Sequence, residues 1–266
     1  MSLLNDLTLG QYLPIESPVH RLDPRTKLCG TLIIMAALMF AKDLWIYGPI
    51  YVWMSLVCYL SHLPFATVFK NIRAFSWLLA VTFFAHALFT PGMTLHFAGY
   101  HISWITHEGI QQGALFTARL TVIMTVAAIL TLTTAPIEVA DGLESLLKPF
   151  KRIGVPAHEL AMMMVIALRF IPTLVEEADR LQKAQIARGA NFSSNPILRA
   201  RKLMALLIPL MLSAFRRADE LALAMEARCY RGGTGRTQFR ELFLTSRDYL
   251  ALAMVFMMII LGWLTL

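Results

Sequence analysis

Residues 178–189 read ADRLQKAQIARG, and residues 218–229 repeat this helical pattern as ADELALAMEARC. An Ile-Pro step precedes each copy, with the prolines at Pro172 and Pro209. A segment repeated once in an otherwise non-repetitive chain indicates two equivalent surfaces, and therefore two similar partners. Six matched positions are identical: Ala178 and Ala218, Asp179 and Asp219, Leu181 and Leu221, Ala184 and Ala224, Ala187 and Ala227, Arg188 and Arg228.

The spacing of these shared residues places most of them on one helical face. Ala178, Leu181, Ala184 and Arg188 follow the i, i+3, i+4 rule, as do their counterparts in the second copy. Small alanines let another surface approach the backbone, and a terminal arginine can bind a carboxylate through two hydrogen bonds. Compensation of the helix dipole would explain a cation here, but any lysine would supply that 0.3–1 kcal/mol or so. The repeated pattern therefore favours a docking role.

Composition identifies a membrane protein. Hydrophobic residues make up 57% of the 266 positions and charged residues only 15%, which exceeds the apolar share of a soluble domain. A membrane span needs roughly 20 mainly apolar residues. The charge-poor stretches predict about five spans, at residues 28–42, 44–61, 74–91, 109–135 and 248–265.

The basic residues predict the orientation of these spans. Of the 24 Lys and Arg residues, 17 lie between Pro136 and Asp248, and others precede the first span or lie in the 62–73 loop. Only Lys42 separates spans one and two, and no Lys or Arg separates spans three and four. By the positive-inside rule, the N-terminus, the 62–73 loop and the 136–247 segment are cytoplasmic. The C-terminus is then outside.

The expected fold is an all-α polytopic membrane protein with a cytoplasmic domain of long helices. Residues 1–135 form the N-terminal region and membrane domain, residues 136–247 the cytoplasmic domain, and residues 248–266 a last transmembrane helix. Asp23 and Pro24 have the residue types of a helix N-cap and first helical position. Residues 90–109 alternate and are rich in aromatic and β-branched residues, which predicts an extracellular hairpin or loop.

Three helices are expected within the 136–247 segment. Residues 137–150 read as an amphipathic helix. A long helix starts at Pro156 and a second runs to about Tyr230, with a stop signal at 189–196 between them. Both long helices are apolar first and charged last, so each can descend from lipid into the cytoplasm.

Catalytic chemistry is not indicated. The seven histidines form no HExxH motif or cluster with cysteine, so no metal site is expected. His86 and Arg119 are the polar residues placed deepest in the predicted spans, where ionisable groups are candidates for function. No buried acid accompanies them, so the favoured interpretation is that Arg119 pairs internally or reaches the membrane surface.

The chain resembles the transmembrane (T) component of energy-coupling factor transporters, the EcfT/CbiQ family. Residues 10–27, GQYLPIESPVHRLDPRTK, are similar to the family's N-terminal region. ALRFIPTLVEEADRLQKAQIARGA at 167–190 and AMEARCYRGG at 224–233 are similar to its two signature helices. Cys229 departs from the pattern, which often has glycine at that position; Gly232 and Gly233 could supply the turn instead.

The resemblance implies a non-catalytic membrane scaffold. Two ABC-type ATPases, identical or different, would bind the ends of the long helices, and a membrane-embedded S component would bind a vitamin or transition-metal ion. ATP and Mg would be bound by the ATPases and no cofactor by this chain. Arg188 and Arg228 would each contact one ATPase, flanked by Ala187 and Gly189 in the first copy, and by Ala227 and Cys229 in the second. The protein would lie in the bacterial cell membrane.

The remaining expectations concern two prolines as candidate hinges and two alternative functions. Pro172 and Pro209 are candidate flexing points, since proline interrupts helical hydrogen bonding. A stand-alone secondary transporter is the alternative function, and it predicts a midplane cavity lined by polar residues. A membrane-bound enzyme lacks a catalytic constellation. The mixed acids and bases of residues 136–248 favour a protein or lipid interface over nucleic acid.

Overall fold

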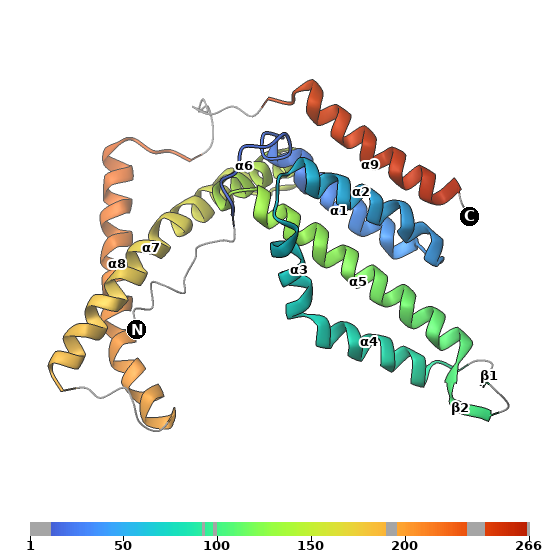
Figure 1. Cartoon of the computed structure of the whole chain (residues 1–266). Helices are drawn as coiled ribbons and strands as arrows, with labels where there is room; N and C mark the ends of the chain where they lie inside the picture. The colour runs from blue at the N-terminus through green and yellow to red at the C-terminus, as the bar shows by residue number, and fades with distance from the viewer. Residues whose placement is uncertain (1–11, 92–93, 98–99, 190–195, 233–242, 265–266) are drawn as a thin grey trace. The chain divides into compact units, whose positions relative to one another are not determined.

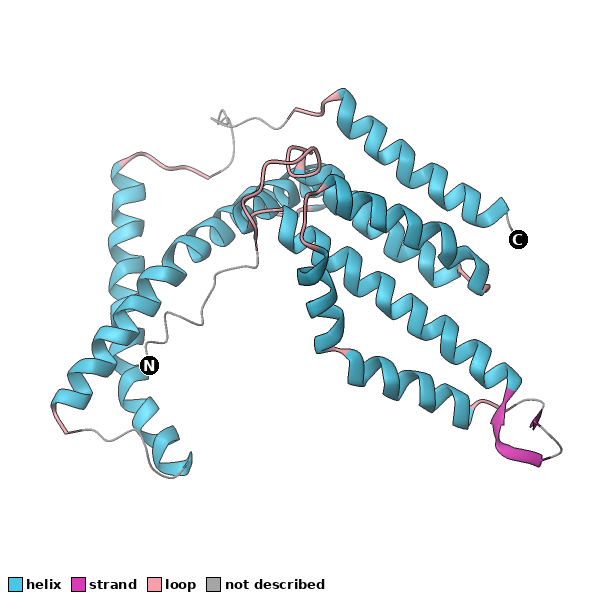
Figure 2. Cartoon of the chain, viewed as in Figure 1, coloured by secondary structure: helices cyan, strands magenta, loops and turns pink. Residues whose placement is uncertain are grey.

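The computed structural model describes residues 12–91, 94–97, 100–189, 196–232 and 243–264. Helices form nearly all of these ranges, as Figure 2 shows, so the predicted all-α class is confirmed. The chain divides into two compact units, with the division inside helix α6. We refer to Tyr12–Gly142 with Glu241–Leu266 as the membrane unit, and to Leu143–Arg240 as the coupling unit. Both labels follow the parts expected from the sequence and its family resemblance.

The membrane unit contains five long or medium helices, two short ones and a hairpin (Figure 1). Its elements are α1 (Pro24–Phe40), the 3₁₀ helix η1 (Leu44–Ile46), α2 (Tyr47–Leu60), α3 (Phe65–Ala74), α4 (Ser76–Phe89), β1 (Thr94–Phe97), β2 (Tyr100–Thr106), α5 (His107–Thr133), the start of α6 (Pro136–Leu147) and α9 (Ser246–Leu264).

The core of the membrane unit lies among α1, α2, α5 and α9. Leu38, Ile50, Val122 and Met258 are almost fully buried in one hydrophobic cluster, although the last comes from the far end of the chain. A second cluster joins the ends of α2 and α5 to α3 through residues such as Val68 and Leu132. Burial of these side chains holds α9 to helices that lie more than 100 residues earlier in the chain.

Helices α4 and α5 pack closely because glycine lines their contact. A Cβ on Gly113 would lie 2.9 Å from the carbonyl oxygen of Phe83, and one on Gly109 would lie 2.9 Å from the carbonyl oxygens of His86 and Ala87. Such spacing of small residues on one face allows two backbones to approach within a membrane. Glycine at 109 and 113 is therefore a packing requirement.

A single carboxylate links the start of α1 to the start of α9. Asp23 caps α1 as predicted, accepting a hydrogen bond from the backbone of Arg25 at 2.8 Å. Asp248 is 1% exposed and accepts hydrogen bonds from the backbone nitrogens of Asp23 and Thr245, each at 2.8 Å. Because helix starts leave N–H groups without intrahelical partners, this side chain stabilises both termini at once.

The structure corrects the prediction for residues 62–73. That segment was expected to be a loop, but α3 occupies most of it and meets α4 at a bend of 54°. Val68 and Ile72 of α3 pack into the second core cluster, and this tertiary contact supports a helix of only ten residues. The hairpin expected after α4 is confirmed: β1 and β2 pair antiparallel, with Phe97 opposite Tyr100.

The helices that can cross a membrane by length and composition are fewer than the predicted spans. Among the described residues, α5 and α7 qualify alone, and α3 with α4 qualifies as one bent span. The five predicted spans each coincide with a helix, namely α1, α2, α4, α5 and α9. Helix α7 comes from the segment expected in the cytoplasm, and it qualifies because its first half is apolar.

The coupling unit consists of the end of α6, the 3₁₀ helix η2 (Lys148–Ile153), α7 (Ala157–Ala187) and α8 (Pro196–Ala227). The predicted amphipathic helix at 137–150 is thus slightly shorter and continues as η2. Pro172 and Pro209 both lie inside uninterrupted helices. Proline lacks an N–H, so each helix lacks one backbone hydrogen bond at that point.

Candidate partner-binding site at the ends of helices α7 and α8

Both copies of the repeated segment end their helices with the same backbone geometry. Arg188 donates its backbone N–H to the carbonyls of Ala184 and Gln185, and the following Gly189 has a φ of +88°. Arg228 donates to the equivalent carbonyls of Ala224 and Met225. The repeat in sequence is therefore also a repeat in structure.

Cys229, the residue after Arg228, has an unexpected backbone conformation. Cys229 has a φ of +56°, so it takes the left-handed conformation that glycine takes in the first copy. Its N–H bonds the carbonyl of Glu226, and the N–H of Tyr230 bonds that of Met225. These two bonds complete a Schellman motif. Cys229 itself makes the turn, and Gly232 is not needed for it, although Gly232 also has a positive φ.

All six residues expected at the docking sites are exposed. They are Ala187, Arg188, Gly189, Ala227, Arg228 and Cys229. A helix end normally leaves carbonyl groups that need partners, but the turns satisfy part of that need here. The arginine side chains are consequently available for contacts outside the chain.

The two copies differ ten residues before their ends. Asp179 is 6% exposed and forms an ion pair of 2.6 Å with Lys183. The matching pair in the second copy is Asp219 and Leu223, both exposed, so no equivalent ion pair can form. The shared aspartate therefore has two different environments, and the two surfaces are similar without being identical.

Helices α7 and α8 contact each other through an ion pair between the residues that directly precede the two copies of the repeat. Arg217 donates to a carboxylate oxygen of Glu177 at 3.0 Å, and the Ser213 hydroxyl bonds the same carboxylate. Residues 177 and 217 are 40 positions apart, like the two arginines of the repeat. Arg188 lies eleven residues beyond Glu177, and Arg228 lies eleven residues beyond Arg217. At about 1.5 Å per residue, both helix ends lie roughly 16 Å beyond the ion pair.

A groove of about 470 Å³ adjoins the end of α8. Met162 and Ile166 of α7 form one side, and Leu221 and Met225 of α8 form the other. Arg228 and the residues from Cys229 to Gly232 line its end. Sequence reasoning missed this groove, because its two sides are about 60 residues apart in the chain. The available signals were the apolar first half of α7 and the apolar positions 221 and 225 in the otherwise charged second half of α8.

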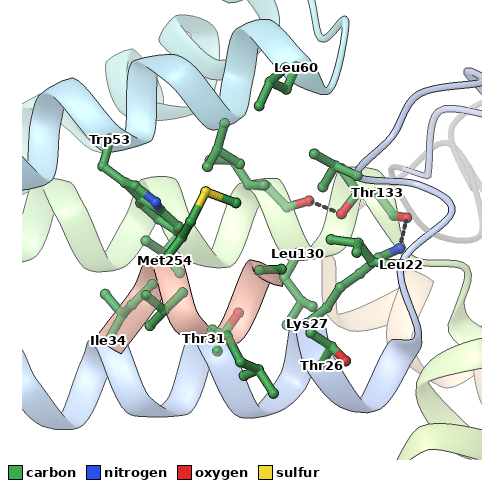
Figure 3. Close-up of a pocket in the computed structure, with 18 of the residues that line it drawn as sticks. Leu22, Thr26, Lys27, Thr31, Ile34, Trp53, Leu60, Leu130, Thr133 and Met254 are labelled. Carbon is green, nitrogen blue, oxygen red and sulfur yellow. Dashed lines mark hydrogen bonds between the residues drawn. The ribbon is translucent and has the colours of Figure 1, made fainter. Parts of the chain in front are cut away.

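The membrane unit contains a smaller pocket, shown in Figure 3, among α1, α2, α5 and α9. Its volume is about 130 Å³, below the 300–1,000 Å³ typical of small-molecule sites. Most of its lining is apolar, and the buried Lys27 at one end donates to the carbonyls of Thr133 and His20 at 2.9 and 3.1 Å. This pocket does not provide the polar midplane cavity that a secondary transporter requires.

Arg119 is paired inside the membrane unit, as the favoured interpretation expects. Its guanidinium donates to the carbonyl of Ala41 at 2.7 Å and to the Tyr47 hydroxyl at 3.3 Å. It also lies over the Phe116 ring at 5.1 Å, and the His86 ring contacts Phe116 at a tilt of 45° with centroids 4.4 Å apart. Ala41 caps the end of α1, where a cation offsets the helix dipole. These contacts explain both polar residues structurally.

The chain is similar to known proteins over most of its length. Residues 16–239 match the CbiQ family, described as cobalt transport protein. The chain is 48% identical over 266 residues to the energy-coupling factor transporter transmembrane protein EcfT of Acidaminococcus fermentans, covering 98% of each chain. It is 46% identical to EcfT of Thermanaerovibrio acidaminovorans, covering 96% of this chain and 94% of the relative. With EcfT of Bacillus subtilis the identity is 42%, over 92% and 93%. Both the helix-end motifs and the extent of these matches lead to one conclusion: the chain belongs to the EcfT/CbiQ family of transporter membrane components.

Proposed function

We propose that this chain is the coupling subunit of an energy-coupling factor importer in the bacterial cell membrane. Two ABC-type ATPases, the same or different, bind the cytoplasmic ends of α7 and α8. A membrane-embedded S component binds a vitamin or a transition-metal ion. The ATPases bind ATP and Mg and hydrolyse the nucleotide, while this chain transmits the motion and carries out no catalysis.

The observation that carries this proposal is the pair of matching helix ends. Arg188 and Arg228 are exposed, and each is followed by a residue in the left-handed conformation. Dipole compensation alone would not require the same turn and the same preceding alanine twice. Two equivalent ends joined through Glu177 and Arg217 are suited to binding two homologous partners.

The apolar part of α8 supports a further partner within the membrane. Its exposed side chains recur at i, i+3, i+4, i+7, i+8 and i+11, and so follow one face of the helix. Only 6% of the most apolar window of α7 is buried. Surfaces of this kind fit the S component or lipid. The exposed residues on α8 are Met204, Leu207, Ile208, Met211, Leu212 and Phe215.

Replacing the two arginines tests the docking. Arg188→Ala or Arg228→Ala leaves a carboxylate of the ATPase without its partner, which costs about 2–5 kcal/mol, or roughly 30- to 5,000-fold in affinity. Lys substitutions restore only part of this loss, because a lysine does not offer two parallel donors. Co-purification of the ATPases with each variant, followed by affinity measurement, provides the readout.

Arg180→Ala is the matched control. Arg180 lies on the same helix as Arg188, is 81% exposed and forms only a 3.8 Å pair with Glu176. Its removal is expected to change ATPase affinity little, because Arg180 does not lie at the helix end. Loss of its exposed pair with Glu176 also costs α7 only about 0–1 kcal/mol. Undiminished co-purification of both ATPases with the Arg188→Ala/Arg228→Ala double variant at high salt would refute the docking role.

The two prolines are tested separately from docking. If α7 and α8 flex at Pro172 and Pro209, alanine at either position restores a backbone hydrogen bond and slows transport without changing assembly. The measurement is substrate uptake by the assembled complex in vesicles, together with subunit stoichiometry. Wild-type transport rates in both variants would remove the hinge role and leave the docking role intact.

A further inference from the structure

The 3₁₀ helix η2 separates its side chains by kind. Its sequence is KPFKRI, and a 3₁₀ helix has three residues per turn, so side chains at i and i+3 lie above one another. Lys148 therefore lies above Lys151, and Pro149 above Arg152. The remaining pair, Phe150 and Ile153, forms an apolar edge.

Both kinds of edge are open to the surroundings. Ile153 is 80% exposed and Phe150 is 49% exposed, so the apolar edge of η2 is not covered by the rest of the chain. Lys151 and Arg152 are also exposed. An open hollow is lined by Lys148, Pro149, Lys151 and Arg152. Lys148 also interacts with another group of the chain, so Lys151 and Arg152 are the cations of this wall on which a ligand site can be built.

The surrounding contacts fix η2 in this orientation. Gly154 follows it with a φ of +92°, and its N–H bonds the carbonyl of Lys151 at 3.1 Å. Across the turn, His158 at the start of α7 bonds Glu144 of α6 through its Nδ1 at 3.1 Å. These contacts hold η2 between α6 and α7, so its basic side chains project from an ordered turn.

We propose that η2 binds the phosphate headgroups of anionic phospholipids. The hollow holds a phosphate against Lys151 and Arg152, while Phe150 and Ile153 enter the boundary between headgroups and acyl chains. This combination of clustered cations with adjacent aromatic and aliphatic residues is typical of interfacial membrane contacts. Compensation of the helix dipole at the end of η2 would need one cation at most, and it would not require two exposed apolar side chains.

The consequence is that the coupling unit is held at headgroup level where α7 begins. This inference is independent of the proposed function, because it requires neither an ATPase nor an S component. It identifies an acidic lipid as a second kind of partner, bound by residues other than the docking arginines.

Lipid binding to the purified full-length chain tests the proposal. Native mass spectrometry in detergent compares phosphatidylglycerol with phosphatidylcholine of the same acyl chains. Each cation near an anionic surface contributes about 1 kcal/mol, or about fivefold. Lys151→Gln/Arg152→Gln therefore lowers phosphatidylglycerol affinity roughly 25-fold and leaves phosphatidylcholine affinity unchanged. The charge-preserving control Lys151→Arg/Arg152→Lys retains the preference.

Four outcomes would overturn the proposal. Equal affinity of the wild type for the two lipids removes the site, as does an unchanged preference in the folded double variant. Displacement of phosphatidylglycerol by excess inorganic phosphate indicates a site for a free anion. Loss of ATPase co-purification with an unchanged lipid preference indicates an acidic protein surface. Thermal unfolding confirms that the variants fold, and if the double variant does not, Lys151→Gln alone is expected to lose about fivefold.

Discussion

The membrane unit and the coupling unit are built from similar helices but packed to different degrees. In the most apolar window of α5, 33% of the residues are buried, against 6% in that of α7. Helix α7 buries only Ala157, Ala161 and Asp179, and the described side chains of α8 include no buried residue. The membrane unit thus derives its stability from its own contacts, whereas the described side chains of α7 and α8 remain mostly exposed.

The largest effect is expected where α4 and α5 approach each other. Gly113→Leu places a side chain against the backbone of Phe83, where a Cβ alone would be 2.9 Å from the carbonyl oxygen. A backbone atom cannot move aside as a flexible side chain can, so we expect a loss of about 3 kcal/mol in the free energy of unfolding. Thermal unfolding of the purified chain in detergent measures this loss.

Gly48→Leu is the control for that variant. Gly48 lies in α2, and a Cβ there would meet no atom within 4 Å. The variant is expected to unfold like the wild type. If Gly48→Leu and Gly113→Leu destabilise the chain equally, the tight contact between α4 and α5 is not what distinguishes the membrane unit.

A smaller loss is expected at the carboxylate shared by two helices. Asp248→Ala leaves the backbone N–H groups of Asp23 and Thr245 without their acceptors. A buried donor without a partner costs about 1–3 kcal/mol, and Thr245 can regain water, so we expect a total loss of about 2 kcal/mol. Asp248→Asn keeps one carbonyl oxygen and loses less.

Asp43→Ala is the control for Asp248→Ala, because it removes the same charge at the start of another helix. Asp43 precedes η1 and its side chain makes no capping hydrogen bond. Asp43→Ala is expected to unfold at the wild-type temperature, within the precision of the measurement. An equal loss in both variants would show that net charge, and not the shared cap, accounts for the effect of Asp248→Ala.

The smallest effect is expected at the end of α8, and it has the opposite sign. Cys229 holds a left-handed conformation that costs a residue with a Cβ about 1 kcal/mol, so Cys229→Gly should stabilise the Schellman turn by about 0.5–1 kcal/mol. Hydrogen exchange at the amides of Cys229 and Tyr230 reports on this turn. The reciprocal Gly189→Cys should weaken the end of α7 by a similar amount. Exchange rates that rise in Cys229→Gly would contradict the prediction.

Local sequence signals predicted much of this fold. Asp23 and Pro24 mark the start of α1 because capping depends on adjacent residues, and the alternation at residues 90–109 gave the hairpin for the same reason. Helix α3 escaped prediction, since Val68 and Ile72 are stabilised by a cluster that includes the end of α5. Propensity within a ten-residue window does not report on such contacts.

The candidate site was predictable in composition but not in geometry. The repeated segment located both arginines, since their spacing is visible in the sequence. The left-handed turn at Cys229 was not predicted, because this conformation favours glycine. The backbone hydrogen bonds from Cys229 and Tyr230 stabilise the turn although its residue is less favourable. The pairing of Glu177 with Arg217 was also missed, as it depends on where α7 and α8 meet.

The position of that ion pair has a mechanical consequence. Arg188 lies eleven residues beyond Glu177, and Arg228 lies eleven residues beyond Arg217. The two side chains of the pair are partly exposed, so the pair contributes only about 0–1 kcal/mol. A movement at either helix end therefore meets the same weak restraint at the same distance along its helix, and the contact favours neither end over the other.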